Sequence, residues 1–380
     1  MMKIERVLVH VVEVPGSQAR THQLIQVAGL NRVQYTHTSA PAEGPTYLMV
    51  MRVQTDEGVE GICTFDGHGG DPRYVVQLVR NHVVGQDPFR REFLFQKLHQ
   101  GTRWLYQRPG WFGTLDNCLW DITGKVAGLP IYALLGKNRD GVPAYLTAGD
   151  GPVEMYIEHI EQGRELGINA YKPHSYKGGK ADIPIMVALR EHVGPDYDLM
   201  LDPVCSYTLR EAIEVGHVLE ELDFVWLEEP FFEQKMHHYQ ELCAELVIPI
   251  MANETLMYDM DLSAQWLIHG ATDRLRANAR HGTTQVLKMA HMAELHGTTI
   301  ELNGVGGIFG HVHAQLGCSI ANNSYYEHTG GGRRMMEDGL KIGLLNPPEI
   351  IDGELVPADG PGWGAEWDLD TLESLTVEMI

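Results

Sequence analysis

Three carboxylates that end three strand-like runs, Asp202, Glu228 and Glu254, constrain this chain more than any other feature. The runs read DLMLDP, FVWLEEP and IPIMANET, and their acids lie 26 residues apart at each step. That spacing matches one strand followed by one helix, and side chains that end the strands of a parallel barrel gather at its carboxyl face. Carboxylate oxygens that converge there suit a hard divalent cation such as Mg²⁺. We therefore predict a magnesium site formed by these three acids.

The composition excludes several classes of partner. The net charge of −22 over 380 residues argues against nucleic acid or an anionic membrane surface as a partner. Five scattered cysteines, without CxxC spacing, predict neither a disulfide framework nor a zinc site. No apolar run approaches the roughly 18 residues of a membrane span, and the first 14 residues alternate like a strand rather than a signal peptide. We expect a soluble, cytoplasmic protein.

The amino-terminal third reads as a mixed α+β region. Strands are predicted at 3–14 and 46–55, and the polar 16–45 segment between them reads as a lid loop. Its Arg20, His22 and Arg32 are candidate contacts for an anionic substrate. Helical periodicity follows from about 71 to 135, and the GKNRDG turn indicates a domain boundary.

Beyond that turn, strand-like runs and helices alternate. Seven strand signals follow one another through residue 303, with a further candidate around 324–327. This alternation predicts an α/β fold with a closed parallel barrel and its chemistry at the strand carboxyl ends. We predict an amino-terminal domain over 1–137, a barrel over 138–350, and a loop-rich segment over 351–380 that folds back on the first domain.

The motifs in this order resemble the enolase superfamily, specifically its mandelate racemase-like acid-sugar dehydratases. The matching stretches are DNCLWDITGKVAGLPIYALLG, YKPH, LMLD, VWLEEP, NET and SYYEH, and they run through most of the chain. The resemblance implies a modified (β/α)7β barrel and an α+β capping domain built from both termini. It also implies one essential Mg²⁺ held by Asp202, Glu228 and Glu254, and a homo-oligomer, either a dimer or an octamer built from dimers.

The chemistry that this resemblance implies is abstraction of the proton alpha to a carboxylate. The family usually places a Lys-x-Lys pair on the second barrel strand, and here the segment reads Lys172-Pro173-His174. Residues at i and i+2 of a strand point to the same side. A histidine needs little tuning to act as a base near neutral pH. We predict His174 as the base, and Lys172 as the cation that lowers its pKa and holds the substrate carboxylate.

The opposite face departs from the racemase pattern. The position of the usual Asp falls near Arg276 to Asn278, and Asn303 stands near the usual His. The His-Asp dyad is therefore predicted to be absent, and the later His311 and His313 are read as structural. Glu327, in SYYEH, matches the family's late-strand acid, which binds the substrate carboxylate. Asn278, Asn303 and Glu229 are further candidates for substrate binding.

This departure separates the candidate reactions. A racemase needs a base on both faces, whereas a dehydratase needs one base and an acid for the leaving β-hydroxyl. The sequence therefore favours a Mg²⁺-dependent dehydratase that converts an aldonate or aldarate to a 2-keto-3-deoxy acid. The alternatives are a racemase or epimerase on the same scaffold and a non-catalytic protein that binds acid sugars. Which group protonates the leaving oxygen stays open, with His174 itself, a lid residue and a metal-polarised water as candidates.

Overall fold

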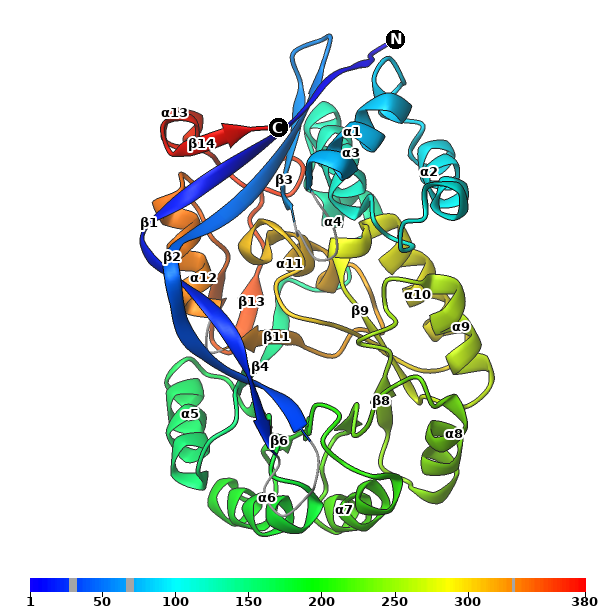
Figure 1. The fold of residues 1–380 in the computed structure, drawn as a ribbon, viewed down its shortest axis with the longest axis vertical. Helices are drawn as coiled ribbons and strands as arrows, with labels where there is room; N and C mark the ends of the chain where they lie inside the picture. The colour runs from blue at the N-terminus through cyan, green and yellow to red at the C-terminus, as the bar shows by residue number, and fades with distance from the viewer. Residues whose placement is uncertain (27–32, 66–71, 330–331) are drawn as a thin grey trace.

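The computed structural model describes residues 1–26, 33–65, 72–329 and 332–380, with side chains described outside 18–42 and 332–335. An antiparallel cap sheet, in the order β14-β1-β2-β3, lies at one end of the molecule (Figure 1). Its strands are β1 (Ile4–Gln26), β2 (Val33–Thr55), β3 (Glu60–Phe65) and β14 (Thr376–Met379). Four helices accompany it: α1 (Pro72–Val83), α2 (Arg91–Leu105), α3 (Gly113–Ala127) and α4 (Ile131–Leu135).

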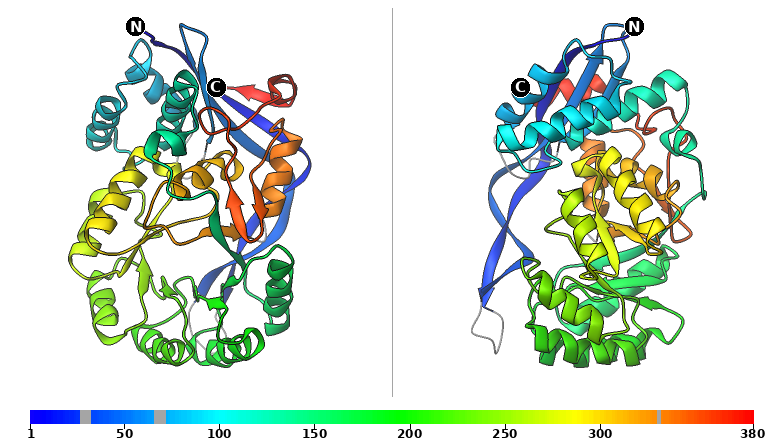
Figure 2. Two further views of the ribbon diagram at one scale, coloured as in Figure 1. Left: turned by 180° about the vertical axis from the view of Figure 1, so that it is seen from behind. Right: turned by 90° about the vertical axis from the view of Figure 1, so that its right-hand side faces the viewer.

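The predicted lid loop is wrong in its secondary structure. The two strands do not end at 14 and restart at 46, because β1 and β2 continue as a paired ribbon from Gln18↔Pro45 to Gln26↔Val33. The register shifts between Glu13 and Gln18 and again further along the ribbon. These irregularities break the strict alternation that identifies a strand in sequence. The ribbon runs down beside the barrel (Figures 1 and 2).

Eight parallel strands form the barrel, and the predicted fold class is confirmed. They are β4 (Val142–Ala148), β5 (Ala170–Pro173), β6 (Asp198–Leu199), β7 (Leu227–Glu228), β8 (Ile250–Ala252), β9 (Arg274–Ala277), β10 (Ile300–Leu302) and β11 (Tyr326–Thr329). β4 pairs with both β5 and β11, and the bridge between Leu201 and Leu227 joins the β6 side to the β7 side. The strands therefore form a ring whose carboxyl ends all face one mouth.

Seven helices connect the barrel strands on the outside of the ring (Figure 1). They are α5 (Val153–Glu165), α6 (Gly179–Val193), α7 (Leu209–Glu221), α8 (Met236–Glu245), α9 (Met260–Ile268), α10 (Thr283–Leu295) and α11 (His311–Gly317). Two short 3₁₀ turns, η1 (Ala279–His281) and η2 (Ile308–Gly310), follow β9 and β10. Local sequence sets the helix ends: Thr208 and Glu211 form a capping box at the start of α7.

The carboxyl-terminal segment contacts both parts of the molecule. After α12 (Gly332–Lys341), the hairpin of β12 (Glu349–Ile351) and β13 (Glu354–Val356) pairs with β4. The chain then returns through α13 (Leu369–Ser374) to β14, which pairs with β1. These contacts agree with the predicted return of the carboxyl terminus, while the domain boundaries at 137/138 and 350/351 stay predictions.

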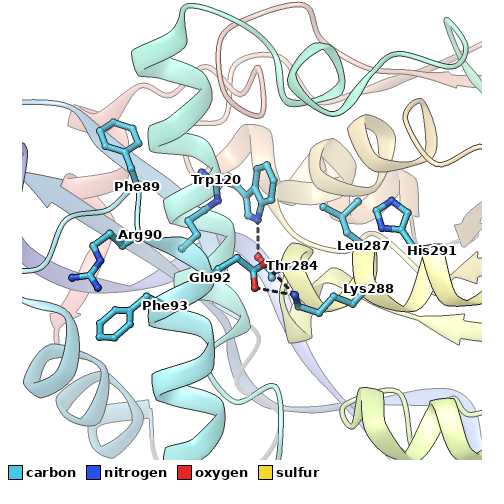
Figure 3. A pocket seen from close by; sticks show the side chains of 10 residues that line it. Phe89, Arg90, Glu92, Phe93, Trp120, Thr284, Leu287, Lys288 and His291 are labelled. Carbon is cyan, nitrogen blue, oxygen red and sulfur yellow. Dashed lines mark hydrogen bonds and ion pairs between the residues drawn. The ribbon is translucent and has the colours of Figure 1, made fainter.

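The cap packs closely on the barrel through α2, α3 and α10. Trp120 on α3 donates its indole N–H to Thr284 Oγ1 at 3.0 Å, and Lys288 pairs with Glu92 at 2.9 Å (Figure 3). One hydrophobic core includes cap residues such as Val7, barrel residues such as Leu275, and Trp363 from the carboxyl-terminal segment. Within the described residues, no helix is both long and apolar enough to cross a membrane.

Candidate active site

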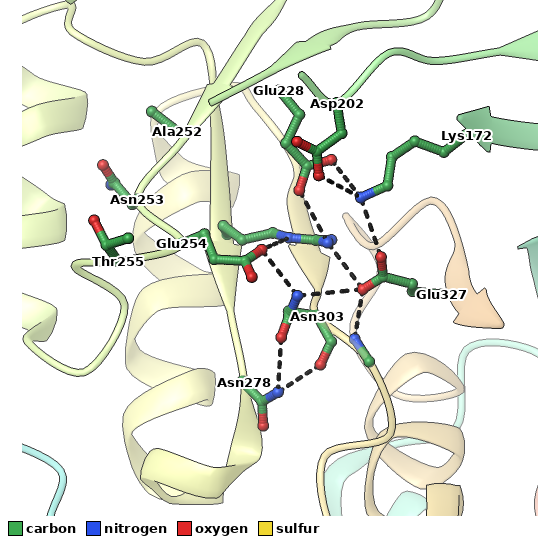
Figure 4. A network of polar contacts seen from close by, with 12 residues as sticks. Lys172, Asp202, Glu228, Ala252, Asn253, Glu254, Thr255, Asn278, Asn303 and Glu327 are labelled. Atoms are coloured by element: carbon green, nitrogen blue, oxygen red, sulfur yellow. Dashed lines mark hydrogen bonds and ion pairs between the residues drawn. The ribbon is translucent and has the colours of Figure 1, made fainter. Parts of the chain in front are cut away.

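The strand ends bring the predicted acids and bases into one polar network. Lys172 comes from β5, Glu228 from β7 and Glu327 from β11, and His174 directly follows β5. Asp202 lies three residues beyond β6 and forms a β-bridge with His174, and Glu254 follows β8. Figure 4 shows the side chains from these different strands converging at the mouth. The shared register that the sequence suggested therefore does place these residues together.

Lys172 is a fully buried cation among three carboxylates. Its Nζ lies 2.7 Å from Glu228 Oε2 and 3.1 Å from Glu327 Oε1. Asp202 Oδ2 is further away, at 3.4 Å. Burial favours the neutral amine, but Glu228 and Glu327 outweigh it and raise the pKa of Lys172 well above its usual value. Lys172 therefore stays charged and is a positively charged anchor in this site.

Arg276 is a functional residue whose role sequence reasoning missed. It is 1% exposed, and its guanidinium lies 3.0 Å from Glu228 Oε1 and 2.9 Å from Glu327 Oε2. Its Nε lies 3.3 Å from Glu254 Oε2. A signal was present in the run TDRLRAN, because an arginine inside a short core strand needs buried carboxylates to pair with.

The three predicted metal ligands are linked in pairs by these two cations. Lys172 joins Asp202 to Glu228, and Arg276 joins Glu228 to Glu254. Burial raises the pKa of Glu228 to about 7, although Arg276 and Lys172 oppose that rise. Within the part of the chain that the structure describes, no three His, Cys, Asp or Glu residues converge closely enough to hold a metal ion in their present positions.

His174 presents one nitrogen to the reaction space and anchors the other. Its Nδ1 lies 2.9 Å from the carbonyl oxygen of Ala148 and 3.0 Å from Thr147 Oγ1. The Thr147 hydroxyl donates its own hydrogen to the carbonyl of Lys172 at 2.7 Å. Both neighbours of Nδ1 therefore act as acceptors, which places a proton on Nδ1. Nε2, 3.1 Å from Asp202 Oδ2, is the nitrogen that gains or loses the second proton.

Lys172 lowers the pKa of His174, as predicted, but the net shift of that pKa is upward. Burial and Lys172 do lower it, but Asp202 raises it by charge and by hydrogen bonding, and the net shift is upward. The same pairing holds the pKa of Asp202 below its usual range despite its burial. The contact with Asp202 therefore favours the protonated form of His174.

Glu327 is the most strongly anchored carboxylate at the mouth. Its Oε2 accepts hydrogen bonds from the Gly304 N–H at 2.6 Å and from Asn303 Nδ2 at 3.3 Å. Burial favours the neutral acid, but Arg276 and Lys172 outweigh it and hold the pKa of Glu327 below its usual range. Glu327 is thus a fixed anion between both cations.

Two amides form the wall opposite His174. Asn303 donates to Glu254 Oε2 at 2.9 Å, and Asn278 donates to Asn303 Oδ1 at 3.2 Å. Arg280 also contacts this pair through Nη2, 2.5 Å from Asn303 Oδ1. Neither amide is a base at neutral pH.

Glu229 and Glu233 are two further buried acids near the predicted metal ligands. Glu229 has a strained backbone, with φ at +25°, and burial together with Glu254 and Asp202 raises its pKa well above the usual value. Glu229 is 4% exposed, and its predicted contact with the substrate stays a prediction. Glu233, which the sequence did not single out, accepts the backbone N–H groups of Glu254 at 3.0 Å and Thr255 at 2.9 Å. It thereby fixes the loop that carries Glu254.

The remaining predicted residues fall in two groups. Arg32 lies outside the described residues, and the side chains of Arg20 and His22 are not described, so their predicted roles stay predictions. His313 is buried, where its Nε2 accepts the Ala279 N–H at 3.0 Å and its Nδ1 lies 2.8 Å from the Gly304 carbonyl. It joins the loops after β9 and β10, which is a structural role.

The fold and the acidic strand ends define an enolase-type barrel with a capping sheet. The chain belongs to the mandelate racemase / muconate lactonizing enzyme family. The model for the N-terminal domain of that family matches residues 24–136, and the model "Enolase C-terminal domain-like" matches residues 155–371. The predicted resemblance is thereby confirmed.

Three relatives illustrate the similarity. The chain is 30% identical to D-galactarolactone cycloisomerase of Agrobacterium fabrum, over 85% of this chain and 90% of that protein. It is 27% identical to D-galactonate dehydratase of Verminephrobacter eiseniae, over 83% and 84%. The crystal structure of D-glucarate dehydratase from Agrobacterium tumefaciens, complexed with magnesium, superimposes with a TM-score of 0.79 at 26% identity, over 99% of each chain.

Proposed function

We propose that this protein is a Mg²⁺-dependent acid-sugar dehydratase, which removes the proton alpha to a carboxylate and eliminates the β-hydroxyl to give a 2-keto-3-deoxy acid. The observation that carries the proposal is the asymmetry of the mouth. His174 offers a titratable nitrogen on one side, whereas Asn278 and Asn303 form the other side among the described residues. Relatives named as dehydratases of galactonate, arabinonate and glucarate support the same reaction class.

The donor set fits a divalent cation. Asp202, Glu228 and Glu254 supply only carboxylate oxygens from adjacent strand ends, which is the ligand chemistry that Mg²⁺ prefers. The mouth also holds more buried carboxylates than buried cations, since Asp202, Glu228, Glu229 and Glu327 are buried there beside Lys172 and Arg276. When bound, Mg²⁺ would supply Lewis-acid stabilisation of the charge that develops on the substrate carboxylate. Asp202, Glu228 and Glu254 are the residues that would hold it.

The protein's own residues account for the proton steps. The neutral form of His174 accepts the alpha proton at Nε2, while the fixed N–H at Nδ1 keeps the ring oriented through Ala148 and Thr147. Lys172 and Arg276 provide positive charge where the enediolate becomes more negative. In a syn elimination, the imidazolium formed in the first step then donates its Nε2 proton to the leaving β-hydroxyl oxygen.

Other reactions on the same scaffold are less well supported. Racemisation or epimerisation needs a second base, and Asn278 and Asn303 occupy the wall where it would stand. A non-catalytic binding protein would not need the buried His174–Asp202 pair. One relative is named a D-galactarolactone cycloisomerase, so that lactone is a second candidate substrate.

A panel of aldonates, aldarates and galactarolactone, each with Mg²⁺, tests the proposal. We expect at least one aldonate or aldarate to yield a 2-keto acid, detected by the absorbance of its semicarbazone. His174→Asn should reduce the rate by at least about a thousandfold, whereas the matched His192→Asn on the outer surface should not. Absence of any keto acid from the whole panel would refute the dehydratase proposal.

The acid-sugar substrate is the proposed small-molecule partner. The predicted homo-oligomer and cytoplasmic location remain predictions.

A further inference from the structure

A cavity of about 390 Å³ adjoins the candidate active site on the side away from His174. It lies between strands β2 and β3 and helix α3 of the cap, the loops that follow β9 and β10, and the last residue of β11. We call it the distal cavity. Its apolar wall is formed by Leu48, Met49, Phe65, Val305 and Phe309.

The distal cavity shares residues with the catalytic network. Arg280 lines it and donates to Asn303 Oδ1 at 2.5 Å. Gly304 lines it too, and its N–H donates to Glu327 at 2.6 Å. A substrate whose carboxylate end lies among Lys172 and Glu327 therefore has this cavity within reach of its far end.

Two polar side chains on the cavity wall, Asn117 and Thr64, already have partners in the protein. Asn117 donates to the Ala279 carbonyl at 2.8 Å and accepts from the Thr283 N–H at 3.0 Å and its hydroxyl at 2.8 Å. Thr64 Oγ1 accepts the Ile308 N–H at 2.8 Å. A hydroxyl group placed beside Asn117 or Thr64 competes with those bonds, whereas a methyl group against the apolar wall does not.

We propose that the distal cavity binds the terminal carbon of the substrate as a methyl group, so that the preferred substrate is a terminally deoxygenated acid sugar. This inference rests on the proposed function, because it assumes that an acid sugar occupies the mouth. A buried hydroxyl that lacks a good partner loses its hydration without replacement. The expected preference for methyl over hydroxymethyl is about ten- to a hundredfold in affinity.

Pairing of Arg280 with a terminal carboxylate is the main alternative to a terminal methyl group in this cavity. Its guanidinium is a charged group on the cavity wall, so a substrate with a second carboxylate at its far end could pair with it. The apolar side chains outnumber it around the cavity, and its Nη2 is committed to Asn303. These observations favour the methyl group over the carboxylate.

Three acids with the same stereochemistry, ending in CH₃, CH₂OH or COO⁻, test the inference by titration calorimetry with Mg²⁺ present. The methyl compound is expected to bind about ten- to a hundredfold more tightly than the hydroxymethyl compound. Equal or weaker binding of the methyl compound, or no binding of any of the three, would overturn the inference. Tighter binding of the dicarboxylate would indicate that Arg280 pairs with a terminal carboxylate in the cavity, and would also overturn the inference.

Turnover of the same compounds is read separately. Binding of the methyl compound without turnover would refute the proposed function and keep the cavity assignment. Turnover that favours the hydroxymethyl compound over the methyl compound would support the proposed function and refute the cavity assignment.

Two substitutions locate the effect in the cavity. Val305→Thr replaces a wall methyl by a hydroxyl of the same size, and it should reduce the methyl preference at least several-fold. Met49→Gln, on the opposite wall, should act in the same direction. The matched control is Val247→Thr, at an 89% exposed position between α8 and β8, which should leave the ratio unchanged. An unchanged ratio in both cavity variants would contradict the assignment.

Discussion

At the scale of single residues, the site is governed by how buried charges compensate one another. Lys172 and Arg276 each contact three carboxylates, and every one of those contacts lies inside the barrel mouth. Removing one such cation leaves buried negative charge without a partner, which costs more free energy than the pair itself contributes.

Arg276→Met is the direct test of this balance. We expect it to lower the free energy of unfolding in metal-free buffer by about 3–5 kcal/mol, measured by urea denaturation. Added Mg²⁺ should stabilise this variant more than the wild type, because the cation replaces part of the lost positive charge. The control is Arg274→Met on the same strand, whose partner Glu301 keeps other donors, including the Ser324 N–H at 3.2 Å. Equal losses in both variants would contradict the role assigned to Arg276.

The sequence predicted which acids meet, but not how their charges are balanced. Period and spacing alone place Asp202, Glu228 and Glu254 at adjacent strand ends, because one βα unit separates each pair. The sign of the His174 pKa shift depends instead on the 3.1 Å contact with Asp202. The role of Arg276 depends on three acids that are distant in sequence. Sequence spacing therefore predicts neither the direction of the His174 pKa shift nor the role of Arg276.

At the scale of elements, the loops after β9 and β10 hold the wall opposite His174. His313 joins them by accepting the Ala279 N–H and donating to the Gly304 carbonyl. Both bonds require a neutral imidazole with its proton on Nδ1. Burial, together with the charges of Arg280 and Arg276, lowers the pKa of His313 to about 3.

This geometry predicts an acid-dependent loss of stability. A depressed folded-state pKa means that the stabilisation is complete above the unfolded value of about 6.5 and is lost as the pH falls. Between pH 7 and pH 5, His313 should lower the free energy of unfolding by about 2 kcal/mol, because it binds a proton in the unfolded state but not in the folded state. Urea denaturation at each pH measures this change. His313→Gln should be less stable at pH 7 and lose less on acidification, whereas the surface variant His192→Gln should follow the wild type. An identical pH slope in His313→Gln would refute this assignment.

The long ribbon of β1 and β2 shows where sequence reading fails at this scale. The register shifts along the ribbon interrupt an alternating pattern, so residues 16–45 resemble a polar loop in sequence. The short barrel strands were predicted more accurately because each is buried on both sides and reads as an apolar run.

At the scale of the whole molecule, one hydrophobic core joins the cap, the barrel and the carboxyl-terminal segment. Trp363 links all three, since it is fully buried and donates its indole N–H to the Asn117 carbonyl at 2.9 Å. Asn117 in turn bonds the barrel at Thr283. The cap and the barrel are therefore parts of one packed unit.

Trp363→Ala is expected to destabilise the protein by about 3–5 kcal/mol and to keep a single unfolding transition. Because the core is shared, near-UV and far-UV circular dichroism should report the same midpoint. The exposed Trp104→Ala, at 80% exposure, is the matched control and should have little effect. Two separate transitions in the Trp363 variant would show that cap and barrel unfold independently.

The central claim, one-base elimination by His174 with a divalent cation, is tested most directly by following the reaction in D₂O by proton NMR, with Mg²⁺ or with excess chelator. We predict a 2-keto-3-deoxy product with deuterium at C3, no epimer at C2 of the remaining substrate, and loss of the reaction in chelator or in His174→Asn. Accumulation of the C2 epimer, or dehydration at the wild-type rate in His174→Asn, would contradict the account.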